Sequence, residues 1–187
     1  MNSASINKSE IHGSVHVGDN NTYKIVLPPA DPQGMASALA RFQALSENDD
    51  DFQYFMERLD FFTSQNSRSP VIGLEKKLTN AGRQDLLEVA VERKDAFAKR
   101  IMRSQLSRRR QWIFYYILQK IDFYFTSQIK PLIRQRQPSE VIDAVIMSGI
   151  VEVIYREVMA EDPTIDLHTI SGMLYFLTGK CHLVWEV

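Results

Sequence analysis

The run WIFYYILQKIDFYF, residues 112–125, decides the fold of this 187-residue chain. Apolar and aromatic side chains occupy nearly every position of the run, so no polar face is left for solvent. A helix that is apolar all round is buried at the centre of a protein. The run is also too short to cross a bilayer, which takes about 20 apolar residues. We therefore predict a central buried helix from Ser107 to about Ile129, kinked or ended by Pro131.

Helical spacing of apolar residues continues on both sides of this run, and capping residues mark the expected helix ends. Asp31-Pro32 and Asp166 are typical of helix starts, whereas Gly82 and Gly179 are typical of helix ends. We predict a mainly α fold of six or seven helices around one core. The expected helices cover residues 32–45, 50–62, 74–80, 84–105, 107–129, 138–160 and 166–178.

Large apolar side chains on these helical faces are expected to form the core. Burying one of them stabilises a fold by about 1.5–3 kcal/mol, so truncating it should impair folding before it impairs function. The predicted core centres on Phe55, Leu59, Trp112, Tyr116, Ile117, Ile146, Ile150, Leu174 and Leu177.

The residues before the helices follow a different pattern. Apolar and polar residues alternate over 11–17 and again over 23–27, with Gly-Asp-Asn-Asn between them as turn residues. We predict an N-terminal β-hairpin, to which the C-terminal tail CHLVWEV, residues 181–187, could add a third strand. The expected organisation is disorder over 1–10, a hairpin and proline linker over 11–30, and a helical domain over 31–187.

A two-stranded hairpin is marginal in water, and its open edges are templates for another strand. We therefore expect copies of the chain to pair through the hairpin into a homo-oligomer, of which a symmetric dimer is the simplest form. The alternative is that the hairpin packs on its own helices with the tail as its third strand. The expected oligomerisation contacts are Val15, Val17, Tyr23, Ile25 and Leu27.

Charge and cysteine content restrict the function classes. The formal net charge is −1, so no global field attracts nucleic acid or a membrane. One cysteine excludes a disulfide framework within the chain and indicates a reducing compartment. The first ten residues hold no apolar stretch typical of a signal peptide. We therefore expect a cytoplasmic protein that has no membrane association.

The strongest local charge lies over residues 93–110, where eight basic residues accompany one acid. Such a patch can bind nucleic acid phosphates or an acidic protein partner. It can equally be a solvated corner, or pair with the acidic residues 47–60 of the same chain. The expected contact residues are Lys99, Arg100, Arg103, Arg108, Arg109 and Arg110.

Catalytic and metal-binding patterns are weak. Cys181 and His182 are neighbours, and neighbouring residues of a strand point to opposite faces. His12 and His16 would lie about 13 Å apart along a strand, too far for an obvious shared metal site. A dyad of Cys181 and His168 has nothing in the sequence that orients it. We expect no catalytic residue, no metal and no cofactor.

Three stretches resemble a known family: ISGMLYFLTGKCHLVW (170–185), VIGLEKKLTNAGRQDLLEVA (71–90) and SVHVGDNNT (14–22). They resemble the helical C-terminal domains of the bacterial ABC-three-component anti-phage systems. The resemblance implies a non-enzymatic adaptor that joins an effector, such as a nuclease, to a sensing ATPase, and that also self-associates. Those partners would be separate polypeptides. The alternatives are a nucleic-acid-binding accessory protein that uses residues 93–110, and a small enzyme whose site forms only on folding.

Overall fold

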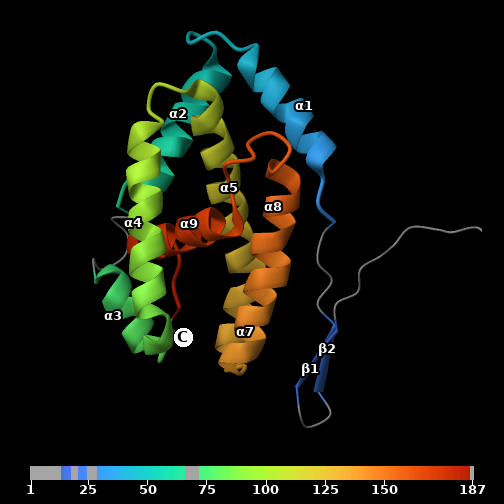
Figure 1. Ribbon diagram of the computed structural model, residues 1–187, viewed down its shortest axis with the longest axis vertical. Helices are drawn as coiled ribbons and strands as arrows, with labels where there is room; N and C mark the ends of the chain where they lie inside the picture. The colour runs from blue at the N-terminus through green and yellow to red at the C-terminus, as the bar shows by residue number, and fades with distance from the viewer. Residues whose placement is uncertain (1–13, 18–20, 25–28, 66–71, 186–187) are drawn as a thin grey trace, which may run out of the picture.

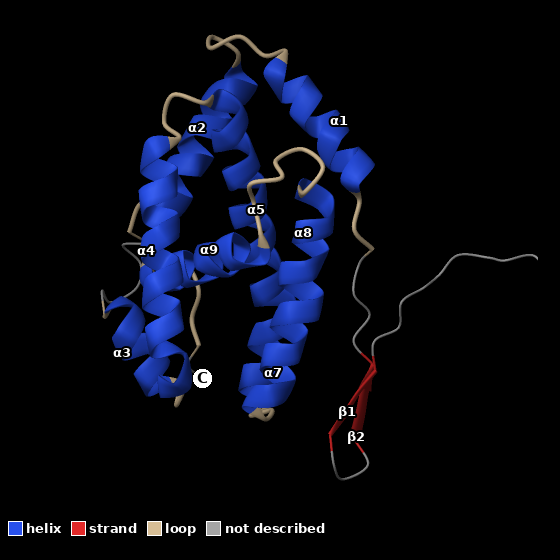
Figure 2. Ribbon diagram, in the orientation of Figure 1, coloured by secondary structure: helices blue, strands red, loops and turns tan. Residues whose placement is uncertain are grey.

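The computed structural model describes residues 14–17, 21–24, 29–65 and 72–185 of the chain. Most helices run along the long axis of the molecule, and α9 crosses between α4 and α8 (Figures 1 and 2). The helices are α1 (Pro32–Gln43), α2 (Asp50–Thr63), α3 (Gly73–Asn80), α4 (Leu87–Arg103), α5 (Arg108–Tyr124), α6 (Lys130–Arg134), α7 (Ser139–Ile146), α8 (Glu152–Val158) and α9 (Leu167–Gly179).

Short turns of other helix types join several of these helices end to end. A 3₁₀ turn, Gln84–Leu86, leads into α4, and π-helical turns link α5 to α6 (Phe125–Ile129) and α7 to α8 (Met147–Val151). Within the described residues the chain therefore forms seven continuous helices, and the prediction of a mainly α fold is right. Of the two outcomes predicted for Pro131, a kink or an end, the end is wrong, because α6 continues through Pro131 to Arg134. The wider π turn directly before it accommodates a residue that has no backbone N–H.

Side-chain caps fix the helix ends where the sequence predicts them. Asp31 accepts from the backbone N–H of Gly34 at 2.8 Å, and Asp166 accepts from that of Thr169 at 2.7 Å. Gly82 follows α3 with φ of 71°, a left-handed conformation that favours glycine. These contacts satisfy backbone groups that a helix end leaves unpaired.

The core surrounds α5, as the apolar run predicts. Phe114, Ile117 and Leu118 have no exposed surface. Of the predicted core, Tyr116 and Ile146 are only partly buried. The predicted core residues that are buried are Phe55, Leu59, Trp112, Ile117, Ile150, Leu174 and Leu177.

Two short strands precede the helical body. β1 (Ser14–Val17) and β2 (Asn21–Lys24) pair antiparallel, with Val15 opposite Tyr23. The turn residues 18–20 and residues 25–28 lie outside the described part of the chain. Every core side chain that the structure describes comes from residues 35–185.

The predicted fold class is wrong in making the N-terminal hairpin part of the domain, because none of the described core residues comes from β1 or β2. The helices close the core among themselves, so the domain is α-helical and does not need an N-terminal hairpin. Within the described residues the tail adds no third strand, because its polar groups bond to helices. Lys77 Nζ donates to the carbonyl oxygens of Thr178 at 2.8 Å and Leu183 at 3.5 Å. Trp185 Nε1 donates to Thr178 Oγ1 at 3.0 Å.

None of the helices in the described segments combines the length and the apolar character that a membrane span requires.

Candidate protein-binding groove

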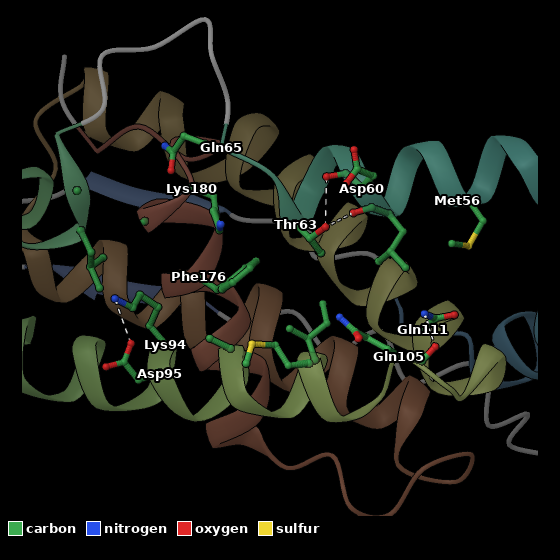
Figure 3. Close-up of a pocket in the computed structure, with 17 residues that line it drawn as sticks. Met56, Asp60, Thr63, Gln65, Lys94, Asp95, Gln105, Gln111, Phe176 and Lys180 are labelled. Atoms are coloured by element: carbon green, nitrogen blue, oxygen red, sulfur yellow. Dashed lines mark hydrogen bonds and ion pairs between the residues drawn. The ribbon is translucent and has the colours of Figure 1, made fainter.

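A cavity of about 640 Å³ lies between α2 and α4, and most of the surface that lines it is apolar although polar side chains also contribute. Figure 3 shows side chains of the two helices facing each other, with Phe176 of α9 between them. Leu59 and Phe176 are buried at its base, whereas Met56 and Met102 are exposed at its mouth. Met102 keeps 63% of its surface exposed. We call this feature the α2–α4 groove.

The α4 wall follows helical spacing. Lys94, Ala98, Ile101 and Met102 of α4 line the cavity, and residues three, four and seven apart share one face of a helix. Gln105, in the turn after α4, also lines it. Helical spacing predicts that the apolar side of this helix packs against the core. Periodicity alone did not separate residues that meet the core from residues that meet an open groove.

Several polar groups that line the groove bond within the chain. Thr63 Oγ1 donates to the carbonyl oxygen of Leu59 at 3.0 Å. Gln111 Nε2 donates to the carbonyl oxygen of Gln105 at 3.0 Å, and Lys94 pairs with Asp95 at 3.1 Å (Figure 3). The surface that the groove offers to a ligand is therefore chiefly apolar.

Charged side chains of both signs also line the groove. Asp60 comes from α2, Lys94 and Asp95 come from α4, and Lys180 follows α9. The lining of the groove is therefore of mixed charge.

Part of the predicted basic contact set is engaged inside the molecule instead. Arg100 donates to the carbonyl oxygen of Thr164 at 2.7 Å and also to the hydroxyl of Thr164. Arg108 donates to the carbonyl oxygen of Leu45 at 2.9 Å, and its guanidinium lies 4.3 Å from the ring centre of Phe52. Both arginines join segments more than sixty residues apart.

The next two arginines hold the loop before α9. Arg109 donates to the backbone carbonyl oxygen of Glu161 at 2.9 Å and to its carboxylate at 2.7 Å. Arg110 Nε lies 3.7 Å from a carboxylate oxygen of Asp162. These contacts favour the interpretation of a protein-facing corner, and nucleic-acid binding through this patch stays a prediction.

We expect Arg100→Ala to destabilise the domain, because it removes hydrogen bonds that hold the α8–α9 loop on α4. Charged hydrogen bonds are worth about 1.5–3 kcal/mol each, and partial exposure places the expected loss near the lower value. Urea denaturation measures it. Arg103→Ala is the matched control, since Arg103 is exposed on the last turn of the same helix. Equal stability of the two variants would contradict the assigned role of Arg100.

The predicted oligomerisation contacts remain untested. The backbone of Val15, Val17 and Tyr23 is described, but their side chains lie outside the described residues. Ile25 and Leu27 lie outside them entirely. Strand-mediated association of copies therefore stays a prediction.

The considered Cys181–His168 dyad does not form. His168 lies on the first turn of α9, and Cys181 follows the end of that helix. The eleven helical residues 169–179 lie between the two and separate them by about 16 Å. Cys181 is buried, and its sulfur accepts from Gln65 Nε2 at 2.9 Å.

A cluster of titratable side chains lies where the tail meets α2 and α5. Burial raises the pKa of Asp122, and the charges of His182 and Arg58 oppose that rise. Burial lowers the pKa of His182, whose Nε2 lies 3.2 Å from the carbonyl oxygen of Ser64. The ring of His182 packs 4.8 Å from that of Phe61. Burial therefore disfavours the charged form of both groups.

We expect Asp122→Asn to raise the melting temperature at neutral pH. A carboxyl whose folded pKa is raised contributes stability below its unfolded pKa and loses it as pH rises through the folded pKa. The asparagine does not ionise, so this loss should vanish. Melting curves recorded from acid to neutral pH measure the difference. A variant that is less stable than the parent at neutral pH would show that the charged carboxylate is favoured instead.

The fold and the groove together define a small helical domain that presents an open apolar surface between two helices. The family model of C-terminal domain 9 of the ABC-three component (ABC-3C) systems matches residues 73–185, and the chain belongs to this family. The match confirms the predicted resemblance. It places the chain in an anti-phage defence system of several proteins, which indicates protein partners. No curated protein and no solved structure matches the chain.

The matched region contains the α4 wall and part of the base of the α2–α4 groove. Residues 73–185 include α3, α4, α5 and α9, whereas α2 precedes the match. The α2 wall of the groove therefore comes from a part of the chain that lies outside the matched domain.

Proposed function

We propose that this chain is a non-enzymatic adaptor that joins other protein components of an ABC-three-component defence system. Its partners would be the ATPase of the system, an effector such as a nuclease, or both. Membership of the family supports a role in such a system. The α2–α4 groove is the observation that carries the adaptor role.

Exposed apolar surface in the groove supports protein binding rather than catalysis. Contiguous apolar patches on a protein surface mark interaction sites. Met102 lines the mouth of the groove, and fully exposed Leu106 lies in the turn that follows α4. Burying these two side chains against a partner would be favourable at about 25 cal/mol for each Å² removed from water.

Pairwise co-expression of the full chain with each other component of its own system tests the proposal. We expect one of these proteins to co-elute with the chain in size-exclusion chromatography, at the mass of a complex by light scattering. A component from an unrelated system is the control. Separate elution of every pair, and of the three proteins expressed together, would contradict the adaptor role.

A further inference from the structure

We propose that two copies of this chain form a symmetric dimer through one end of the helical domain, with an acidic stripe on α2 of each copy against a basic corner of the other. This inference goes beyond the proposed adaptor function, because it concerns a second copy of the chain rather than another component. The two surfaces are the α2 stripe, Asp50, Tyr54 and Glu57, and the α4 corner, Lys99, Arg103 and Leu106.

The α4 corner combines free cations with an uncovered apolar side chain. Lys99 and Arg103 are exposed on the last two turns of α4, and Leu106 is fully exposed in the turn that follows. Unlike Arg100, the two cations have no ion pair or side-chain hydrogen bond among the described residues. The corner is therefore available to a partner that brings negative charge and an apolar contact.

The α2 stripe offers the complementary chemistry. Asp50, Tyr54 and Glu57 are spaced four and three residues apart, so they share one face of the helix. All three are exposed, and Tyr54 keeps 60% of its surface in solvent. Tyrosine and arginine are the residue types that protein interfaces favour. The stripe thus presents two carboxylates on either side of an aromatic ring.

Both surfaces lie at the same end of the molecule. α2 begins where α4 ends (Figure 1). Arg108, just after the corner, lies 4.3 Å from the ring centre of Phe52 and donates to the carbonyl oxygen of Leu45. Nevertheless, no ion pair joins residues 47–60 to residues 93–110 within the part of the chain that the structure describes. The charges that could pair within one copy are left for a second copy.

A two-fold axis at this end satisfies both surfaces at once. Every contact of a symmetric dimer occurs twice, with the same residues exchanged between the copies. The corner of each copy then meets the stripe of the other, so cations face carboxylates and Leu106 meets Tyr54. Like charges would meet if stripe faced stripe or corner faced corner, so charge selects the exchanged arrangement. Nucleic acid would suit the corner alone, because the stripe beside it repels phosphates.

Light scattering of the full chain over an about hundredfold range of protein concentration tests the dimer. We expect the mass of a dimer at high concentration in about 0.1 M salt. In 1 M salt the dissociation constant should rise at least about tenfold, because the Debye length falls from about 10 Å to about 3 Å. A monomer at every concentration, or a dimer indifferent to salt, would overturn the inference.

Reversing either surface should separate the copies. Lys99→Glu with Arg103→Glu opposes carboxylates to carboxylates, and Asp50→Lys with Glu57→Lys opposes cations to cations. Both double variants should be monomers, with melting temperatures close to that of the parent. Leu106→Ser, at a fully exposed position that the fold does not use, should weaken the dimer at least about tenfold. A variant of these three that keeps the dissociation constant of the parent would contradict the proposed contacts.

Lys76→Glu with Arg134→Glu is the matched control for net charge. These are an exposed lysine on α3 and an exposed arginine on α6, and both lie outside the two surfaces. The control changes the net charge as much as the reversed corner does, so it should leave the dimer intact. Loss of the dimer in this control would mean that net charge, rather than the paired surfaces, governs association.

Mixing the two reversed variants gives a result that misfolding cannot imitate. The reversed corner then meets the reversed stripe, and the unchanged stripe meets the unchanged corner, so both contacts are attractive again. We expect a heterodimer that is at least about tenfold tighter than the self-association of either variant. The reversed stripe mixed with the Lys76→Glu, Arg134→Glu control has only one attractive contact and should bind more weakly. Absence of the heterodimer would overturn the inference.

The same variants identify any other occupant of this end. A dimer formed through the N-terminal strands would survive both reversals. A monomeric parent whose reversed corner alone loses a labelled DNA duplex, or loses another component of the system, would assign the corner to that ligand. Each of these results overturns the inference, whereas co-elution with another component tests the adaptor function separately.

Discussion

Gly172→Ala is expected to lower the stability of the domain by about 1–3 kcal/mol, although alanine is normally the better helix former. Gly172 lies within α9 where that helix crosses α4. A Cβ atom added at this glycine would lie 2.5 Å from the carbonyl oxygen of Arg93 and 3.1 Å from its carbonyl carbon. Both atoms belong to the backbone, so the contact cannot be relieved by rotating a side chain.

Close packing at this crossing explains the size of the effect. Removing a glycine from a helix interior typically stabilises it by about 0.5–1 kcal/mol, and overpacking a core typically costs about 1–3 kcal/mol. The clash should dominate, because α9 would have to move away from α4. Phe176 lies one turn further along α9 at the base of the groove, so the same variant should weaken partner binding.

Gly179→Ala provides the matched control at the end of the same helix. There the nearest atom to an added Cβ is Cδ of Lys94 at 3.4 Å, part of a flexible side chain. We expect this variant to be as stable as the parent or slightly more stable. Thermal melting of both variants measures the contrast. A Gly172→Ala protein as stable as Gly179→Ala would show that the two helices do not approach this closely.

Local chemistry predicted most of the helical fold. Asp31, Ser107 and Asp166 cap helices through side-chain oxygens because they directly precede runs with helical spacing. The buried central helix followed from the run at 112–125 in the same way. These signals depend on residues a few positions apart, so a single sequence contains them.

Features that depend on distant residues were not predictable. The groove exists because α2 and α4 flank a space that they do not fill, and Met102 has the same helical spacing as a core residue. From the sequence, Arg108 is a candidate for nucleic-acid contact. In the structure it donates a hydrogen bond to the carbonyl oxygen of Leu45. The prediction that the hairpin forms part of the fold was wrong, because alternation of apolar and polar residues in a short segment does not show whether that segment packs into the core.

Lys120→Met is expected to destabilise the domain by about 3–5 kcal/mol, because it leaves the buried Glu157 carboxylate without its cation. Glu157 on α8 is 1% exposed. Lys120 Nζ donates to its two carboxylate oxygens at 2.6 and 2.7 Å, and Tyr116 donates to one of them at 3.1 Å. The backbone N–H of Asp31 also donates to this carboxylate at 3.1 Å, so the network joins the start of α1 to α5 and α8.

The same substitution should also change how the stability of the domain depends on pH in alkaline solution. Burial lowers the pKa of Lys120 and its bonds to Glu157 and Tyr116 raise it, with a net rise. A lysine with a raised folded pKa contributes stability that is present below its unfolded pKa and is lost as pH rises through the folded pKa. The difference in unfolding free energy between the parent and Lys120→Met should therefore become smaller in strongly alkaline solution.

A double variant separates loss of a cation from loss of packing. Lys120→Met combined with Glu157→Leu removes both charges, and replacing a buried ion pair by apolar residues is often neutral or stabilising. We expect the double variant to recover most of the stability that Lys120→Met loses, as measured by urea denaturation. Lys130→Met, at a partly buried lysine on α6, controls for the loss of a positive charge. If the double variant is as unstable as Lys120→Met, the hydrogen bonds to Tyr116 and Asp31, rather than the ion pair, hold these helices together.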